Sequence, residues 1–583
     1  MNGSLRTLRR KTTSAVLFGT TAMLAVSGMF RPLHAQSGAD TPSHVDVAEV
    51  GHTSAGSTYI PTDSWIYPAA LRLYYLGYLP TAYLGLRPWT RSSLAHMLQL
   101  SDDALRTADA ESEATQIALR LRQELAPELN GEDRPQFIAE SLYARTQYLN
   151  GPVLNDSFHF GQTVVNDYGR PFQSGFNAIA GYSARSSAGP FSLYVRGELQ
   201  HAPSANGITP ALAATLVAID TVGLNPALPS IPSGPIAAQS NFRLLEANAS
   251  VHLAGHEISF GKSDEWMGPA QGGSFAWSNN AENIYGLRIN RVEPLYIPGL
   301  SRITGLFRYD FLVGSLKGHS QPNDPWIHAE KISFKPTPDI EFGFERTVIW
   351  GGKGHVPVTL HTFLRSFVSV AAVQPPVKFS RDDPGARFST FDATLRLPWW
   401  NHLVTLYTDS LVHDNVFPVS NPGRAGFRPG VYLSRLNGAA HIDLRAEATT
   451  TDPKDPGNVR GQFLYFEAAQ LQGYTNRGFI LGDWVGRQSK GGQAWLTWHI
   501  RPDQSLQFEY RNAKAATSFI PGGTTQHQFA VHAVLRPVRD VEIKATAMQE
   551  LWKAPLLATG QQKDFIGSLQ VTWYPRFQNR LKP

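Results

Sequence analysis

The sequence predicts an all-β transmembrane barrel of about 18 antiparallel strands, preceded by a small N-terminal α-helical bundle. Three observations predict it. Apolar and polar residues alternate through residues 137–574, short and long connections take turns between the alternating segments, and residues 59–131 show helical spacing instead. Aromatic residues make up 11% of the chain. After residue 35 there is no apolar run of the roughly 20 residues that a membrane-spanning helix needs.

Residues 1–35 are expected to form a signal peptide. A basic stretch, Arg9 to Lys11, precedes an apolar run from Ser14 to Phe30, and Ala35 offers a small residue at a cleavage point. The alternative is an N-terminal membrane anchor, but the apolar run is shorter than the roughly 20 residues of a spanning helix. Residues 36–58 are rich in Ser, Gly and Thr and are expected to form a flexible linker.

The charge balance argues against a nucleic-acid partner. The chain has 52 Lys and Arg against 47 Asp and Glu. Five of the basic residues and none of the acidic ones lie in residues 1–35, so the chain after the predicted signal has 47 of each. The excess of positive charge therefore belongs to the predicted signal, and the rest of the chain has no net positive charge to attract nucleic acid. The sequence contains no cysteine, which excludes disulfides and thiolate chemistry.

Residues 59–131 are expected to form the helical bundle. Trp65, Leu71, Tyr74 and Tyr78 fall on one face of a predicted first helix. Residues 92–100 are expected to form a second helix. Residues 107–129 are expected to form a third, with acidic residues at its start and a glycine after its end.

Residues 137–574 are expected to form the barrel, followed by a short basic tail over 575–583. In one predicted strand Phe191, Leu193 and Leu199 alternate with Arg196 and Glu198, and successive side chains of a strand point to opposite faces. The same pattern recurs over residues 442–449, 506–511, 541–548 and 565–573. Charged residues on one face and apolar, aromatic residues on the other indicate a wet interior and a lipid-facing exterior.

The connections between the predicted strands fall into two classes. Short turns are predicted at 187–190, 336–339, 398–401, 501–504 and 536–540. Longer segments rich in Gly, Pro and Asn are predicted at 201–241, 349–387, 413–440, 473–491, 512–525 and 552–563. Short periplasmic turns that alternate with longer external loops are typical of outer-membrane barrels.

Motifs for catalysis are not found. The sequence has neither a Gly-x-Ser-x-Gly nor a His-Glu-x-x-His pattern. Residues 261–263, Gly-Lys-Ser, resemble the end of a phosphate-binding loop, but His256 stands where the first glycine is required. The sequence therefore predicts no catalytic residue, no cofactor and no metal site.

The segment 261–283 is the densest group of unusual residues, because it combines tryptophans, carboxylates, amides and glycines. Aromatic rings suit the C–H faces of sugars, and amides and carboxylates suit their hydroxyls. The predicted carbohydrate-binding residues are Asp264, Glu265, Trp266, Trp277, Asn279 and Asn280. The alternative is an inward-folded loop held by hydrogen bonds and glycine turns. The loops at 349–361 and 474–492 allow the same two interpretations.

Three segments resemble a known family, the Wzi-type capsule-assembly outer-membrane proteins. The first runs from Tyr59-Ile60-Pro61-Thr62-Asp63-Ser64-Trp65 through Leu76-Gly77-Tyr78 to Gly85-Leu86-Arg87-Pro88-Trp89-Thr90-Arg91. The second runs from Gly261 through Trp266-Met267-Gly268-Pro269 to Ser278-Asn279-Asn280-Ala281, and the third from Lys331 to Gly343. The resemblance implies an 18-stranded barrel in the cell outer membrane, with residues 59–131 as a periplasmic helical bundle.

The resemblance also implies a lectin-like role without enzymatic turnover: binding or anchoring capsular or surface polysaccharide and assisting capsule assembly. The expected partners are that polysaccharide and outer-membrane lipid. The aromatic face of residues 59–131 predicts a docking surface, either on the barrel or on the polysaccharide export machinery. Two alternatives stay open. One is a porin-like channel for solutes or glycan, suggested by the charged strand faces. The other, ranked last, is an outer-membrane hydrolase, because no spacing singles out a nucleophile and a base.

Overall fold

The structure is a computed structural model of the whole chain. It describes residues 55–131, 135–221, 228–369, 377–398, 402–415, 418–436, 441–455, 461–575 and 578–580. The predicted signal peptide and most of the predicted linker lie outside the described residues.

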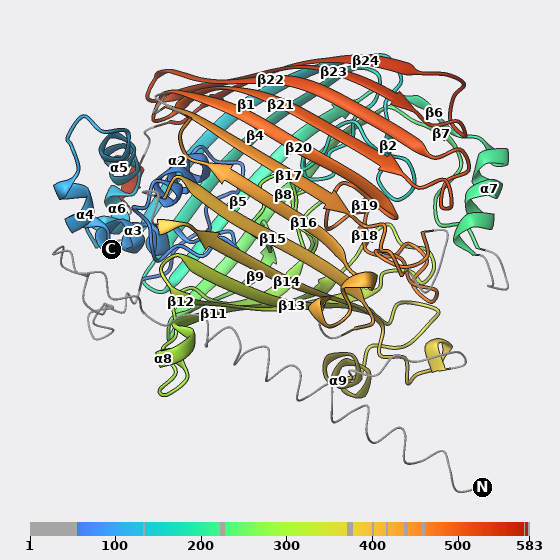
Figure 1. Cartoon of the computed structure of the whole chain (residues 1–583), viewed down its shortest axis with the longest axis horizontal. Helices are drawn as coiled ribbons and strands as arrows, with labels where there is room; N and C mark the ends of the chain where they lie inside the picture. Colours follow the sequence, from blue (N-terminus) through green and yellow to red (C-terminus); the bar gives the residue numbers. More distant parts are fainter. Residues whose placement is uncertain are drawn as a thin grey trace, which may run out of the picture. The chain divides into compact units, whose positions relative to one another are not determined.

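The chain forms a closed antiparallel β-barrel, as the sequence predicts (Figure 1). Among the described residues the barrel sheet contains 19 strands. Eighteen of them form the barrel wall, and the nineteenth is the short β25 (Gln578–Arg580). The barrel strands are β1 (Gln136–Asn150), β4 (Gly175–Ala188), β5 (Phe191–Ala202), β8 (Gln239–Leu253), β9 (His256–Lys262), β10 (Gly286–Arg291), β11 (Leu306–Ser315), β12 (Trp326–Thr337), β13 (Ile340–Trp350), β14 (Ala386–Arg396), β15 (Val404–His413), β16 (Gly426–Leu433), β17 (Ile442–Thr450), β20 (Ser489–Arg501), β21 (Gln504–Ala515), β22 (Thr524–Val538), β23 (Val541–Lys553) and β24 (Gln562–Trp573).

The seam of the barrel joins the first strand to the last. Residues Leu142–Asn150 of β1 pair with Phe565–Trp573 of β24. β25, which lies in the tail, pairs with Gln136–Ile138 at the start of β1. Part of the tail therefore returns to the barrel and extends the seam.

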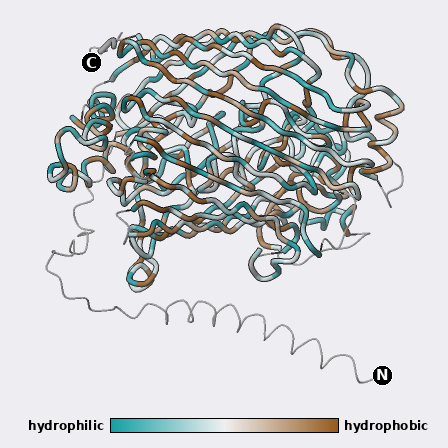
Figure 2. The backbone as a smooth tube through the Cα atoms, turned by 45° about the horizontal axis from the view of Figure 1, so that its top comes forward, coloured by the Kyte–Doolittle hydropathy of each residue, from teal (hydrophilic) through white to brown (hydrophobic). Residues whose placement is uncertain are grey.

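The two faces of the strands differ as the alternation predicts. In β5, Arg196 and Glu198 are buried on the inner face, whereas Phe191, Leu193 and Leu199 are exposed on the outer face. Hydrophilic and hydrophobic residues alternate along the strands in Figure 2. An outer face of exposed aromatic and aliphatic side chains is what a lipid environment stabilises.

The shortest turns and the longest connections lie at opposite ends of the barrel. The turns at 189–190, 254–255, 338–339, 502–503 and 539–540 join neighbouring strands at the end that carries the helical bundle. The opposite end carries longer connections, which contain β2 (Asn155–Asp156), β3 (Gly161–Gln162), β6 (Ala205–Ile208), α7 (Pro210–Asp220), β7 (Gly234–Ile236), α9 (Leu360–Val368), η2 (Val377–Phe379), η4 (Pro418–Ser420), η5 (Pro422–Arg424), β18 (Thr475–Asn476) and β19 (Phe479–Ile480). The end with long loops is therefore the external end.

The predicted loop over 413–440 is wrong in one respect, because β16 lies inside it. Pro429 and two glycines, Gly426 and Gly430, interrupt the strand pattern in the sequence. The structure accommodates Pro429 because it pairs with Thr408 of β15, while the pairing of β16 with β17 skips this position. The tertiary context overrides the local signal.

The helical segment consists of α2 (Ile66–Tyr75), α3 (Arg91–Gln99), α4 (Asp102–Thr107), α5 (Glu113–Glu124) and α6 (Ala126–Leu129). The single helix predicted over 107–129 is two helices, α5 and α6. α5 begins only at Glu113, where Ser112 caps it by accepting a hydrogen bond from the Thr115 N–H, and Pro127, which has no N–H to donate, lies in the first turn of α6. α8 (Ser301–Thr304) lies between β10 and β11. Within the described residues, no helix combines the length and apolar character needed to cross a bilayer.

Candidate functional site

The interior of the barrel is occupied by the chain's own segments. α2 enters the lumen, where Tyr75 packs on Tyr432 of β16 with ring centroids 4.0 Å apart. The strand residue Glu341 holds the segment that follows α2, since its carboxylate accepts hydrogen bonds from the Leu84 and Gly85 N–H groups at 2.8 and 2.9 Å. The segments 263–285 and 461–488 also fold inward and are mostly buried. Together, residues 57–90, 263–285 and 461–488 are called the plug below.

The six predicted carbohydrate-binding residues lie in the plug, and all are buried. Asp264 is the most connected of them. Its carboxylate accepts hydrogen bonds from the Thr62 N–H and hydroxyl at 2.8 Å each, from Tyr168 at 2.9 Å and from the Asn283 amide at 2.8 Å. Asn279 donates to the same Thr62 hydroxyl. The structure thus brings Asp264 and Asn279 together around one residue of the N-terminal segment.

The other four predicted residues have separate surroundings. Glu265 forms an ion pair with Arg288 at 2.9 Å. The Trp266 indole N–H donates to the Ala270 carbonyl at 3.1 Å, and Trp277 belongs to a buried apolar cluster. The Asn280 amide donates to Gln162 at 2.7 Å and to a carbonyl at 3.0 Å. The segment is therefore an inward-folded loop held by internal hydrogen bonds, and direct sugar contact by these residues stays a prediction.

Arg428, on the inner face of β16, is a buried charge of the barrel wall that contacts the plug. It is fully buried and forms ion pairs with two fully buried carboxylates, Glu447 on β17 and Asp483 in the plug. Glu447 also accepts hydrogen bonds from the Gln271 and Gly272 N–H groups at 2.8 and 3.1 Å. Buried charges are tolerated only when they are paired and hydrogen-bonded, so this group ties two plug segments to the barrel wall.

A second buried charge group connects three external loops. His159 lies 2.8 Å from Asp156 and 2.9 Å from Asp220 at the end of α7, and Asp220 accepts from Arg487 at 2.9 Å. Burial alone would lower the pKa of His159, but the two carboxylates raise it to about 9. The pKa of Asp220 is held well below its usual value, because the charges of His159 and Arg487 outweigh its burial. Trp484 and Arg487, in the loop predicted over 474–492, are also buried.

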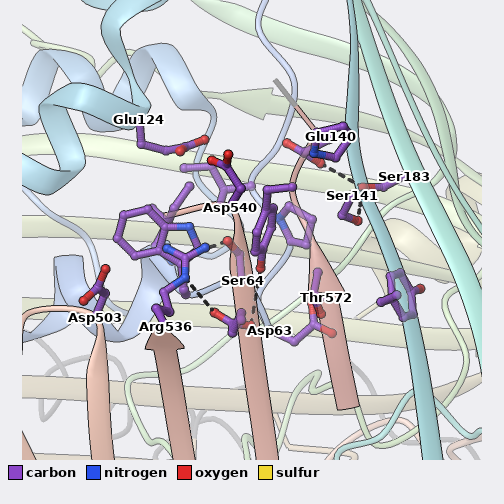
Figure 3. Close-up of a pocket in the computed structure, with 18 of the residues that line it drawn as sticks. Asp63, Ser64, Glu124, Glu140, Ser141, Ser183, Asp503, Arg536, Asp540 and Thr572 are labelled. Atoms are coloured by element: carbon purple, nitrogen blue, oxygen red, sulfur yellow. Dashed lines mark hydrogen bonds and ion pairs between the residues drawn. The ribbon is translucent and has the colours of Figure 1, made fainter. Parts of the chain in front are cut away.

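Two of the cavities within the described part of the chain lie at the helical end of the interior. One has a volume of about 490 Å³ and is bordered by Trp266 and Asn279. The other, of about 230 Å³, lies between the helical bundle and the barrel rim (Figure 3). Both are lined by Asp63, Ser64 and Trp65. Nearer the external end, Trp277 and other plug residues pack against the inner wall in one apolar cluster, and residues of the external loops, among them Phe519, form a second. This arrangement favours a closed lumen over a porin-like channel.

An open groove of about 640 Å³ lies at the external end, between the connection of β11 to β12 and the connection of β13 to β14. It is called the rim groove below and is lined by Ser315, Lys317, Asp324, Trp326 and 352–358. The two connections are joined by backbone hydrogen bonds between Asn323 and Lys353. The Trp326 side chain is 37% exposed. Trp326 lies on the outer face of β12, two residues before His328, so the groove presents its ring on the outside of the barrel, at the end that faces the cell exterior.

Three charged residues border this ring. The Asp324 carboxylate lies 3.1 Å from the ammonium of Lys317 and 3.0 Å from that of Lys353. These two lysines lower the pKa of Asp324 through hydrogen bonds and charge. The Lys353 side chain is 78% exposed. The groove therefore offers cationic donors, a carboxylate acceptor and a ring within one accessible surface.

The sequence pointed to one of the two connections that form the rim groove. It singled out the loop 349–361, which supplies residues 352–358, but not Lys317, Asp324 or Trp326. Those three come from another connection, and no local signal in the sequence joins the two.

One cluster has the composition of a metal site. His413, Asp414 and Glu467 place one ligand atom each within 4.8 Å of one another. The ammonium of Lys378 lies 2.7 Å from Glu467 and already supplies a positive charge there. Despite burial, His413 and Lys378 lower the pKa of Glu467 to about 2. An ion pair therefore accounts for this cluster.

Comparison with solved structures identifies the fold. The chain is similar to Wzi of Escherichia coli, described as an outer-membrane protein involved in group 1 capsule assembly and a carbohydrate-binding β-barrel, with a TM-score of 0.64 and 16% identity. The match covers 90% of this chain and 100% of that one. Two Pseudomonas aeruginosa proteins, OpdL and OprD, match at 9% identity with TM-scores of 0.40 and 0.38; each match covers 77% of this chain, with 99% of OpdL and 96% of OprD. These two scores are too low to carry an argument.

No match to a curated protein is found. The family model described as capsule assembly protein Wzi matches residues 144–566, which is most of the chain. The 18-stranded barrel, with its lipid-facing outer surface, places the protein in the outer membrane. The chain therefore belongs to the Wzi family of capsule assembly proteins.

Proposed function

We propose that this protein binds capsular or surface polysaccharide at its external end and anchors it there without chemical turnover. The observation that carries the proposal is the contrast between a packed interior and the accessible rim groove. Membership of a capsule-assembly family supports the proposal, as does the description of the E. coli protein as carbohydrate-binding.

The rim groove has suitable chemistry for this role. The exposed face of Trp326 stacks on the apolar C–H face of a sugar ring. Lys353 and Lys317 donate to sugar hydroxyls, and they pair with carboxylates where the polysaccharide is acidic. Asp324 accepts hydrogen bonds from hydroxyls and keeps the two lysines in place.

The six predicted sugar-binding residues take a supporting role in this proposal. Asp264, Glu265, Trp277 and Asn280 hold the plug. Trp266 and Asn279 border the inner cavity, so they are the two that a glycan inside the lumen would contact. The helical segment, which exposes Leu100 and Leu119, is proposed to contact the polysaccharide export machinery.

The test is the location of polysaccharide in a deletion strain. Removal of the protein is expected to shift polysaccharide from the cells to the medium without stopping its synthesis. Wild-type protein restores retention, and the variant Lys353→Ala restores it only in part. Lys490→Ala is the matched control, because Lys490 is also an exposed lysine paired with an aspartate, Asp452, at 2.8 Å. Unchanged retention in the deletion strain would refute the proposal.

A further inference from the structure

The helix α9 has its polarity reversed relative to a helix on a water-soluble protein. Thr362 and Ser366 are buried against the barrel. The opposite face carries Leu360, Leu364, Phe367 and Val368, which are exposed by 74, 47, 40 and 66%. These positions follow the spacing of one helix face. A soluble protein buries the apolar face of such a helix, so the arrangement requires an apolar environment outside the barrel.

α9 is held firmly on the outer surface of β12 and β13 at the external end (Figure 1). The Ser366 hydroxyl lies 3.0 Å from His328 Nε2, and Phe363 packs on Trp350 at 5.9 Å. Arg346 of β13 donates to the Ser369 carbonyl just after the last turn. At the other end Thr359 forms a capping box with Thr362. The exposed apolar face is therefore presented by a fixed helix.

The exposed face continues the lipid-facing band of the barrel. Phe367 contacts Phe311 on the outer face of β11 at 6.4 Å. On the neighbouring strands the outer face exposes Leu287 of β10 and Phe260 of β9, and Phe260 is 68% exposed. The helix also covers His328, a polar side chain on the outer face of β12, which is fully buried. α9 thus hides polar groups of the wall and replaces them with apolar ones.

We propose that α9 is an interfacial helix whose face of Leu360, Leu364, Phe367 and Val368 inserts among the acyl chains of the outer leaflet. An amphipathic helix in a membrane interface buries its apolar face in the acyl region. Here the helix lies on the barrel instead of standing free, so it fixes the preceding residues 351–359 and the adjoining rim groove at the membrane surface. The inference rests on the outer-membrane barrel and is independent of polysaccharide binding.

The chain contains no cysteine, so single-cysteine variants report one position each. Leu364→Cys and Val368→Cys are labelled with a nitroxide in the full-length protein, folded into vesicles of phosphatidylethanolamine and phosphatidylglycerol. Phe260→Cys serves as the lipid-facing control. Asp103→Cys on α4 is the aqueous control, because the Asp103 side chain is 99% exposed. Collision rates with oxygen, which concentrates in lipid, and with a water-soluble nickel chelate are then measured.

The proposal predicts that both α9 labels collide more with oxygen than with nickel, with a ratio close to that of the Phe260 label. A ratio like that of the Asp103 label would overturn it, because the face would then lie in water. Shielding from both reagents would also overturn it, because a second protein copy would then cover the helix. Two α9 positions are used so that a folding defect in one variant, detected by heat-modifiable mobility, leaves the other as the test.

Discussion

Segment 263–285 and the rim groove have similar compositions and opposite surroundings. Both combine tryptophan, glycine and charged side chains, and both match the general pattern of a sugar site. In the first, Trp266 and Trp277 are buried and the polar groups bond to the chain itself. In the second, Trp326 and Lys353 are accessible. The comparison teaches that this composition serves internal hydrogen bonding as readily as recognition, and that burial separates the two.

The largest expected effect is at Arg428, where the barrel wall meets the plug. The variant Arg428→Met leaves Glu447 and Asp483 buried without their partner, which costs about 3–5 kcal/mol of stability. The matched control is Arg477→Met, because Arg477 is half exposed in its 2.8 Å pair with Glu282 and should cost under about 1 kcal/mol. Urea unfolding in lipid vesicles measures both. Equal losses would contradict the interpretation of the plug as a buried charge network.

The pH dependence of the free energy of unfolding tests the charged contacts by which His159 connects the external loops. The pKa of His159 is raised to about 9, above the unfolded value near 6.5, so its contribution is complete below about pH 6.5. This contribution is lost as the pH rises through about 9, and it amounts to at most about 3 kcal/mol, at 1.36 kcal/mol per pKa unit. The free energy of unfolding at about pH 6 and pH 10 is the measurement. His159→Gln should flatten the difference, and an unchanged difference would assign it to other groups.

A substitution of Asp264 tests whether the predicted sugar-binding residues contact polysaccharide or only hold the plug in place. Asp264→Ala removes the acceptor shared by Thr62, Tyr168 and Asn283, and leaving their donors buried costs about 1–3 kcal/mol. The expected result is a lower unfolding midpoint with unchanged polysaccharide affinity in the fraction that folds. A loss of affinity with full stability would instead place a sugar contact inside the barrel.

Most of the fold could be predicted from local sequence. Successive side chains of a barrel strand point alternately to the lipid and to the interior, and their polarity alternates with them. Phe191 and Leu193 outside, with Arg196 and Glu198 inside, required no tertiary information. β16 was not predicted, because Pro429, Gly426 and Gly430 interrupt this alternation of polar and apolar residues.

The candidate sites depend on tertiary contacts that the sequence does not display. Nothing in residues 263–285 says whether the segment turns into the lumen or out of it. That direction is set by partners far along the chain, such as Thr62 and Glu447. The rim groove likewise needs two connections that meet only in the folded barrel.

The central claim is that polysaccharide is held at the rim groove of a closed barrel. Its most direct test is the affinity of the purified protein for the purified capsular polysaccharide of its own strain. Trp326→Ala is compared with Trp498→Ala, which removes an exposed tryptophan from β20, outside the groove. Loss of one ring contact, about 0.5–1.5 kcal/mol, predicts roughly two- to tenfold weaker binding for Trp326→Ala and no change for Trp498→Ala. Equal binding by both variants and the wild type would contradict the claim.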